Sequence, residues 1–113
     1  MRIFTGGTLV RWVRAHAGAS VGLSVWRHAA EQATWKNPNE LLDAWVCDLI
    51  KVKPQAGLPA GLTRVVFDIS GNRYRLMCHI HFARQFVFWL KWFGTPAQFD
   101  KIDFTTLQVE DAP

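Results

Sequence analysis

A predicted β-hairpin in the second half of the chain constrains the fold most. Apolar and polar residues alternate over residues 64–69 and again over residues 73–82, and Ser70-Gly71-Asn72 lies between the two segments. A period of two is typical of strands, and Gly71 can adopt the positive φ that a tight turn requires. We therefore expect two antiparallel strands joined by a short turn.

The second strand of this hairpin is expected to have one apolar and one cationic face. The apolar face is Tyr74, Leu76, Cys78, Ile80 and Phe82, and the opposite face is Arg73, Arg75, Met77, His79 and His81. Residues 86–93 are nearly all apolar except for Lys91, which is typical of a central strand covered on both faces. Residues 64–91 contain five cations, Arg64, Arg73, Arg75, Arg84 and Lys91, but one acid, Asp68. The sheet is therefore expected to have a cationic face that suits a phosphodiester backbone.

The N-terminal half predicts one short strand, residues 2–5, followed by helices. Apolar residues at spacings of three and four predict a helix from Thr8 to near Gly18 and a second helix with Ser20 as its N-cap. The residues expected to be buried by the second helix are Val21, Val25, Trp26, Ala29, Ala30 and Ala33.

Two further helix starts are indicated by local capping patterns. Asn37 is the expected N-cap of a third helix, with Pro38 in its first position, Glu40 in its third, and an apolar face of Leu41, Leu42 and Trp45. Thr95 and Gln98 repeat the pattern and predict a short last helix, from which Phe99 and Ile102 pack inward.

These elements predict an α+β fold in one domain, residues 1–113. The N-terminal helices are expected to pack on a mainly antiparallel sheet of about four strands, and a short helix follows the sheet. Residues 53–61 are rich in Pro and Gly and predict a loop inside the domain, because neither half could bury a core alone. The polar end beyond about residue 106 is expected to be loose.

Composition limits the class of protein. The chain has 113 residues and a formal net charge of +4, which permits an acidic or nucleic-acid partner. It has no apolar run of 18 residues and no signal-peptide pattern at its N-terminus, so we expect a cytoplasmic protein with no membrane partner. Cys47 and Cys78 match no metal or redox spacing and are expected to be isolated buried thiols.

Two segments of the second half resemble a known family. They are Phe67-Asp-Ile-x-Gly71-Asn72-Arg73-Tyr74-Arg75-Leu76 and, after an aromatic strand with Lys91, Gly94-Thr95-x-x-x-Phe99-Asp100-Lys101-Ile102. Together they resemble the HigB-type toxins of bacterial toxin–antitoxin systems, a branch of the RelE-like ribonucleases. The resemblance implies a small α+β fold, cleavage of messenger RNA on the ribosome without a metal or other cofactor, and neutralisation by a HigA-type helix-turn-helix antitoxin.

The chain departs from the family pattern near this last helix. Pro96 stands where the family usually has His after Gly-Thr, Phe99 stands where it usually has Tyr, and His79 stands where it often has Lys. Pro96 fits the first position of a helix, so the fold is not affected. The departures remove an imidazole and a phenol from the edge of the expected site. The resemblance assigns this edge to Thr95, Gln98 and Asp100.

The remaining residues could support RNA cleavage by attack of its own 2′-hydroxyl. That reaction needs a proton acceptor, a proton donor and positive charge on the phosphate. We expect Arg75, Lys91 and His79 to be catalytic, and Arg64, Arg73, His81 and Asn72 to bind RNA. Lys91 could instead pair with Asp68, and either histidine could be an ordinary surface residue or the acid or base. No third ligand accompanies His79 and His81, so we expect no metal site.

Two function classes are compatible with these residues. The first is a ribosome-dependent messenger-RNA endoribonuclease that inhibits translation. The second is a RelE-like module that has lost cleavage through Pro96 and Phe99 and binds RNA or a protein partner. The aromatic residues of 86–93 could stack on bases, but core packing explains most of them.

Overall fold

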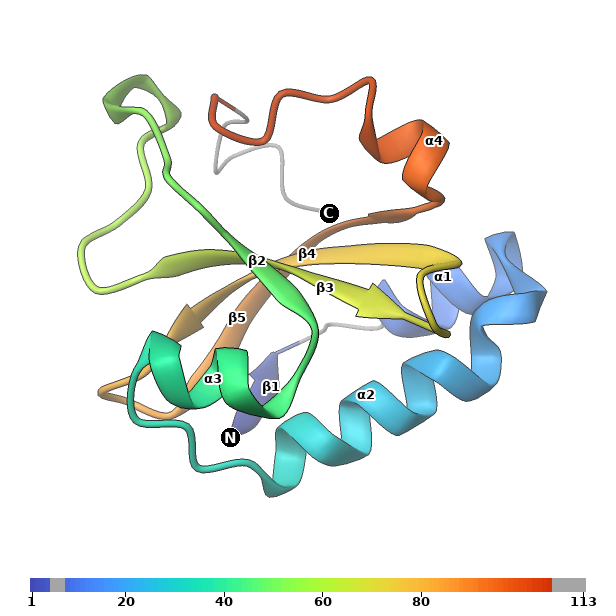
Figure 1. Ribbon diagram of the computed structural model, residues 1–113, viewed down its shortest axis with the longest axis horizontal. Coiled ribbons are helices and arrows are strands. Elements are labelled where there is room, and N and C mark those ends of the chain that lie inside the picture. Colours follow the sequence, from blue (N-terminus) through green and yellow to red (C-terminus); the bar gives the residue numbers. More distant parts are fainter. Residues whose placement is uncertain (5–7, 107–113) are drawn as a thin grey trace.

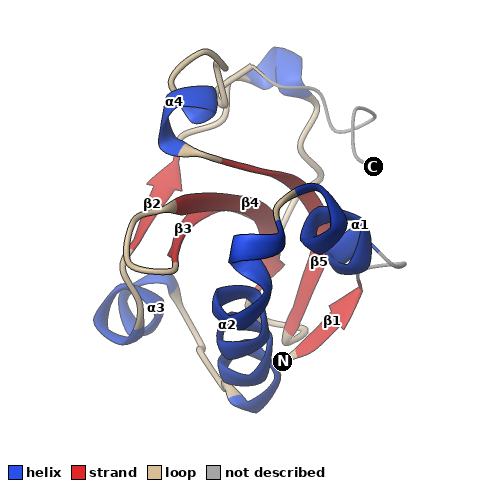
Figure 2. Ribbon diagram, turned by 90° about the vertical axis from the view of Figure 1, so that its right-hand side faces the viewer, coloured by secondary structure: helices blue, strands red, loops and turns tan. Residues whose placement is uncertain are grey.

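The computed structural model describes residues 1–4 and 8–106, which form a mixed five-stranded sheet with helices and a C-terminal segment on its two faces (Figures 1 and 2). The strand order is β1-β5-β4-β3-β2. The strands are β1 (Arg2–Phe4), β2 (Cys47–Ile50), β3 (Thr63–Ile69), β4 (Tyr74–His81) and β5 (Phe86–Gly94). β1 is parallel to β5, and the other neighbouring strands are antiparallel.

The expected α+β class is confirmed, but the expectation of about four strands is wrong. The strand that sequence analysis missed is β2, which pairs with β3 in the register Cys47↔Phe67 to Ile50↔Arg64. β2 lies at the edge of the sheet, and its burial does not alternate along the strand. A short edge strand of this kind lacks the period of two by which strands are identified in a sequence.

The helices follow the expected order. They are α1 (Thr8–Ala15), η1 (Ala17–Ala19), α2 (Ser20–Gln32), α3 (Pro38–Ala44), η2 (Pro54–Ala56) and α4 (Pro96–Phe99). Asn37 caps α3 as predicted, because its Oδ1 accepts from the Glu40 N–H at 3.0 Å. Thr95 and Gln98 form the predicted capping box of α4.

The predicted buried face of α2 is confirmed at Trp26 and Ala30 but is wrong at Val21 and Val25. Its buried residues are Leu23, Trp26 and Ala30, whereas Val21 and Val25 are 77% and 56% exposed. Ser20 is the first residue of the helix and not its N-cap, which is Ala19 without a side-chain hydrogen bond. The helix packs through a stripe that begins at the fully buried Ala19, and this rotates both valines out of the core.

The two faces of the sheet carry separate apolar clusters. On one face, Leu23, Trp26 and Leu41 from the helices pack with Phe67 and Leu76. On the other face, the segment that follows β5 returns over the sheet, above it in Figure 1, whereas α2 lies below. That second cluster contains buried Val66, Met77 and Phe104, with Ile50, Trp92, Phe99 and Ile102 packed against it.

The second cluster corrects the expected cationic face of β4. Met77 and His79 were both assigned to that face, and both are completely buried. Because the segment after β5 covers the middle of the face, charged side chains can meet solvent only toward its ends. The predicted inward packing of Phe99 and Ile102 is confirmed. The expected loose end beyond residue 106 lies outside the described residues.

Candidate functional site

Arg75 and Asp68 form an ion pair at the turn end of the hairpin. They are direct neighbours on β4 and β3, and the Arg75 Nη1 lies 3.0 Å from the Asp68 Oδ1. Their side chains are 19% and 23% exposed, so the pair is mostly buried but reaches the surface. The acid paired with Arg75 is therefore Asp68, the residue that sequence analysis had considered as an alternative partner for Lys91.

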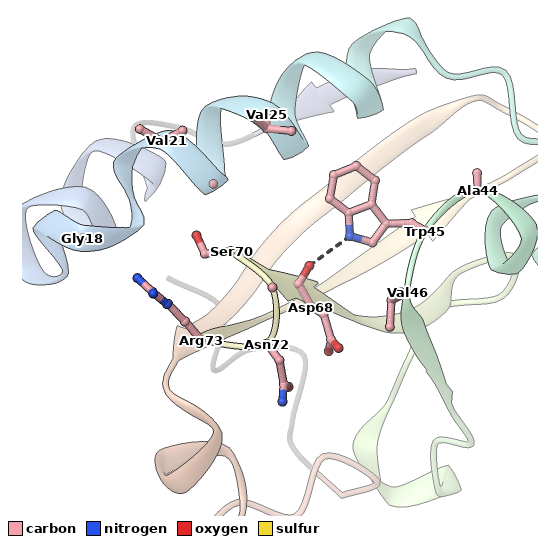
Figure 3. Close-up of a pocket in the computed structure, with 12 residues that line it drawn as sticks. Gly18, Val21, Val25, Ala44, Trp45, Val46, Asp68, Ser70, Asn72 and Arg73 are labelled. Carbon is pink, nitrogen blue, oxygen red and sulfur yellow. Dashed lines mark hydrogen bonds between the residues drawn. The ribbon is translucent and has the colours of Figure 1, made fainter.

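The backbone of Asp68 is fixed by two further contacts. Its N–H donates to the Val46 carbonyl at 3.0 Å, and its carbonyl accepts from the Trp45 Nε1 at 3.0 Å, the dashed line in Figure 3. These bonds join β3 to the segment before β2. The carboxylate that faces Arg75 is thus carried by a backbone position with little freedom to move.

The guanidinium of Arg75 is incompletely satisfied by this pair. Its Nη1 is buried and makes no hydrogen bond of good geometry within the described residues, although the Asp68 oxygen lies 3.0 Å away. The contact is therefore held by charge more than by a directed hydrogen bond. Nη1 is too buried to reach a ligand, so the donors available to an anion such as a phosphate are the other N–H groups of this 19% exposed side chain.

The start of α4 lies next to Arg75. Arg75 is paired with Gly94 on β5, and the capping box follows directly, with Gln98 N–H donating to the Thr95 Oγ1 at 3.2 Å and Thr95 N–H to the Gln98 Oε1 at 2.9 Å. A Cβ at Gly94 would lie 2.6 Å from that Oε1, so the glycine lets the box fold closely over the strand end. The structure thereby brings together Arg75, Thr95 and Gln98, with the exposed Asp100 at the end of α4.

The hairpin turn lies beside the ion pair. Ser70, Gly71 and Asn72 have φ angles of 55°, 60° and 80°. The predicted turn is therefore present, and all three residues have a left-handed backbone conformation. Asn72 and Arg73 are exposed at its tip (Figure 3). Both predicted RNA-binding residues thus lie at the same end of the sheet as Arg75.

Arg64 and His79 do not belong to this surface, which corrects their assignment to an exposed cationic face. Both are fully buried, and the Arg64 Nε donates to the His79 Nε2 at 2.9 Å. Arg64 Nη1 also donates to the Phe104 carbonyl at 2.7 Å, and burial lowers the pKa of its guanidinium. The cause is the segment after β5, which covers both residues. They connect the sheet to that segment from the inside.

The last two predicted residues are His81, which lies far from Arg75, and Lys91, whose side chain the structure does not describe. His81 lies at the opposite end of β4, where its Nδ1 accepts from the Arg84 N–H at 3.1 Å. Six residues of strand correspond to about 20 Å, so His81 cannot share one phosphate with Arg75. Lys91 is in β5, where the register shifts between Met77↔Trp92 and His79↔Phe88, and its side chain lies outside the described residues.

The two residues that depart from the family pattern have structural roles here. Pro96 is the first residue of α4. Phe99 stacks on Phe104 with ring centroids 4.5 Å apart, and the Trp92 ring meets both of them edge-on. A phenylalanine at position 99 therefore fills an apolar cluster, in which a hydroxyl would need a partner.

A groove that sequence analysis did not predict lies on the other side of the hairpin (Figure 3). It has a volume of about 770 Å³ and lies between α2, the segment 44–46 and the hairpin turn. Val21, Val25 and Val46 line it together with Trp45 and Arg73. The sequence contained a signal for it only in Val21 and Val25, which were assigned to the core.

The described residues show neither a metal cluster nor a membrane span. No three His, Cys, Asp or Glu side chains gather within residues 1–4 and 8–106, and none of the helices there is long and apolar enough to cross a bilayer. Cys47 and Cys78 are free thiols, with Cys78 buried as predicted and Cys47 half-buried. Burial is the main cause that raises the pKa of both thiols, that of Cys47 to about 11.

Comparison with known protein families identifies one match. Residues 19–102 match the family model HigB_toxin, described as the RelE-like toxic component of a toxin–antitoxin system. The matched segment begins at the end of η1 and includes α2, the whole hairpin, Arg75 and the capping box of α4. It confirms the resemblance inferred from the residues. No curated protein matches the chain.

Proposed function

The chain belongs to the HigB family of RelE-like toxins, and from this premise we propose that it cleaves messenger RNA on the ribosome without a metal ion. The observation that carries the proposal is the position of Arg75. It is partly exposed, Asp68 pairs with its buried Nη1 and leaves the other guanidinium donors, and it lies between the hairpin turn and the capping box of α4. An RNA backbone that crosses this corner would meet the guanidinium and the exposed Arg73 and Asn72.

In the proposed reaction, Arg75 holds the phosphate that becomes pentavalent. Arginine presents its donors as a planar fork that fits two phosphate oxygens, and positive charge stabilises the additional charge of the transition state. Lys91 on the neighbouring strand is proposed to add a second cation. Thr95, Gln98 and Asp100 form the edge of the site and position the substrate.

We do not propose His79 as the acid or base, because it is buried and accepts a hydrogen bond from Arg64. With Pro96 in place of the family histidine, a described imidazole at this end of the sheet is that of His16, which packs edge-on against Tyr74 and Phe93 on the helix-covered face, opposite Arg75. We therefore propose reduced activity that depends on positioning and electrostatics, since a general acid or base typically contributes about 10² to 10⁴ in rate.

Membership of this family implies an antitoxin partner. We propose that the partner is a HigA-type protein with a helix-turn-helix domain, and that the toxin acts in the cytoplasm, where messenger RNA and ribosomes are found. Translation would stop when the antitoxin is lost and RNA can reach the Arg75 corner.

Arg75→Ala is the direct test of this proposal. Losing a charge-assisted contact of roughly 1.5–3 kcal/mol predicts a decrease of about tenfold to a few hundredfold in cleavage rate. The assays are growth arrest after induction, and cleavage of messenger RNA with ribosomes present. Arg84→Ala is the matched control, because Arg84 is exposed at the opposite end of the sheet. A folded Arg75→Ala protein with full toxicity would contradict the role of Arg75.

The second candidate function is a binding module without cleavage. It is favoured by one observation, the packing of Phe99 into the Trp92–Phe104 cluster, where the family's usual phenol is replaced by an apolar contact. In that case the wild-type chain cleaves no transcript, whereas Arg75→Ala still weakens RNA binding. The same purified proteins therefore separate the two functions.

A further inference from the structure

The exposed apolar side chains of this protein are not scattered over its surface. Among the described residues, the large apolar side chains that are exposed are Val21, Val25, Leu42, Val46 and Leu49, at 39% to 77% of their full area. Three of these five, Val21, Val25 and Val46, line the groove in Figure 3. A concentration of apolar surface around one groove is typical of an interaction site.

The shape of the groove follows from the close contact between α2 and the hairpin. A Cβ at Gly22 would collide with the Ser70 hydroxyl, so the helix touches the turn at this glycine. Val21 and Val25 lie beside that contact, one helical turn apart. Side chains spaced in this way form a ridge, against which the apolar stripe of another helix can pack.

The charges at the groove favour an acidic partner over a second copy of the chain. Two of its described lining residues are charged, Asp68 and Arg73. The Asp68 carboxylate is paired with Arg75 and points away from α2, whereas Arg73 is exposed at the groove end (Figure 3). Two copies would bring Arg73 and a net charge of +4 on each chain toward one another. A partner with an acidic residue at this end would be attracted.

We propose that the groove binds an amphipathic helix of the antitoxin. Its apolar stripe packs on Val21, Val25 and Val46, and an acidic side chain pairs with Arg73. The inference rests on the toxin–antitoxin pairing proposed above and adds the surface through which it occurs. Because Arg73 is two residues from Arg75, a helix in the groove would also obstruct RNA at the hairpin turn without occupying the Arg75 corner.

The test uses the full chain and the purified antitoxin encoded by the neighbouring reading frame. Val21→Asp and Val25→Asp are each expected to weaken the complex at least about tenfold by calorimetry, because a carboxylate would be buried in an apolar contact. Ser24→Asp is the matched control, since Ser24 is exposed on the same helix outside the groove. Arg73→Glu is expected to weaken the complex and to reduce its dependence on salt.

The outcomes separate the groove from the function. Val21→Asp and Val25→Asp proteins that bind the antitoxin with unchanged affinity, and keep their helix content by circular dichroism, would overturn the proposal that the antitoxin binds in the groove. The proposed toxin activity would not be affected by that result. Wild-type chain that elutes alone as a dimer, and becomes a monomer in Val21→Asp, would also overturn the proposal, because the occupant would be a second copy. Failure of the proposed function is seen separately, as wild-type expression that neither arrests growth nor cleaves RNA.

Discussion

At the scale of single residues, the ion pair with Asp68 restricts the orientation of the Arg75 side chain. An unpaired arginine on a strand end would sample many rotamers and lose that freedom on binding a phosphate. Asp68 restricts Arg75 in advance, but it also cancels one positive charge where RNA is proposed to bind. Asp68 therefore improves the orientation of the Arg75 guanidinium but reduces the positive charge beside it. A substitution of Asp68 can separate these two effects.

Asp68→Asn is expected to tighten RNA binding and to slow cleavage. Removing one negative charge adds about one unit to the positive charge that faces the phosphates, which predicts severalfold tighter binding at low salt and a steeper salt dependence. Loss of the held geometry predicts a fall of about tenfold to a hundredfold in the single-turnover rate at saturating RNA. Asp43→Asn, an exposed acid on α3, is the control for net charge. If binding and cleavage increase together, Asp68 only neutralises Arg75.

His79→Ala is expected to destabilise the protein because His79 is the buried acceptor for Arg64. Leaving the Arg64 Nε without its 2.9 Å partner predicts a loss of about 1–3 kcal/mol in the free energy of unfolding, measured with urea. His28→Ala is the control, because His28 is an exposed histidine on α2, and it is expected to change stability by less than about 0.5 kcal/mol. A stable His79→Ala protein that no longer cleaves RNA would return His79 to a catalytic role.

At the scale of elements, most capping and turn chemistry was readable from the sequence, with the expected Ser20 cap as the exception, and tertiary contact was not. The caps at Asn37 and Thr95 and the turn at Gly71 depend on residues within four positions, and the structure confirms all three. By contrast, α2 contains apolar residues on two stripes, and nothing within the helix decides whether Leu23 or Val25 is buried. That choice is made by the sheet, through the close approach at Gly22.

Pro96→His tests whether α4 can carry the group that the family pattern places there. The capping box uses Thr95 and Gln98, so the helix start is expected to survive with a loss of at most about 1 kcal/mol. An imidazole at this position would lie near the Arg75 corner and is expected to raise the cleavage rate by about tenfold or more. Ala97→His is the control, because Ala97 is the exposed neighbour on the same helix. Equal rates in wild type and Pro96→His would show that an imidazole is not the missing group.

At the scale of the whole molecule, the covering of the sheet decides which charges are available. Sequence alternation placed Arg64, Arg75 and His79 on one face, and that assignment is consistent with β pairing. Which of them reaches solvent depends on the return of residues 100–106 over the face, where the Lys53 N–H donates to the Thr105 carbonyl at 2.8 Å. Phe99 and Ile102 indicated that this segment packs inward, but no local feature of the sequence indicated which charged residues it would cover. The expected cationic surface is therefore reduced to its turn end.

The two thiols provide a probe of this two-layer arrangement. Cys78 is fully buried on β4 in the apolar cluster between the sheet and the helices, and we expect it to react only after global unfolding. Cys47 is half-buried, and its pKa is raised from 9.0 to about 11, so its thiolate fraction near pH 8 is lower by about a hundredfold than that of a thiol at its usual pKa. An aromatic disulfide reagent should therefore modify Cys47 slowly and Cys78 at a rate that follows urea unfolding. Cys47→Ser isolates the second reaction. If Cys78 reacts in that variant without denaturant, at a rate independent of stability, the helix layer opens separately from the rest of the fold.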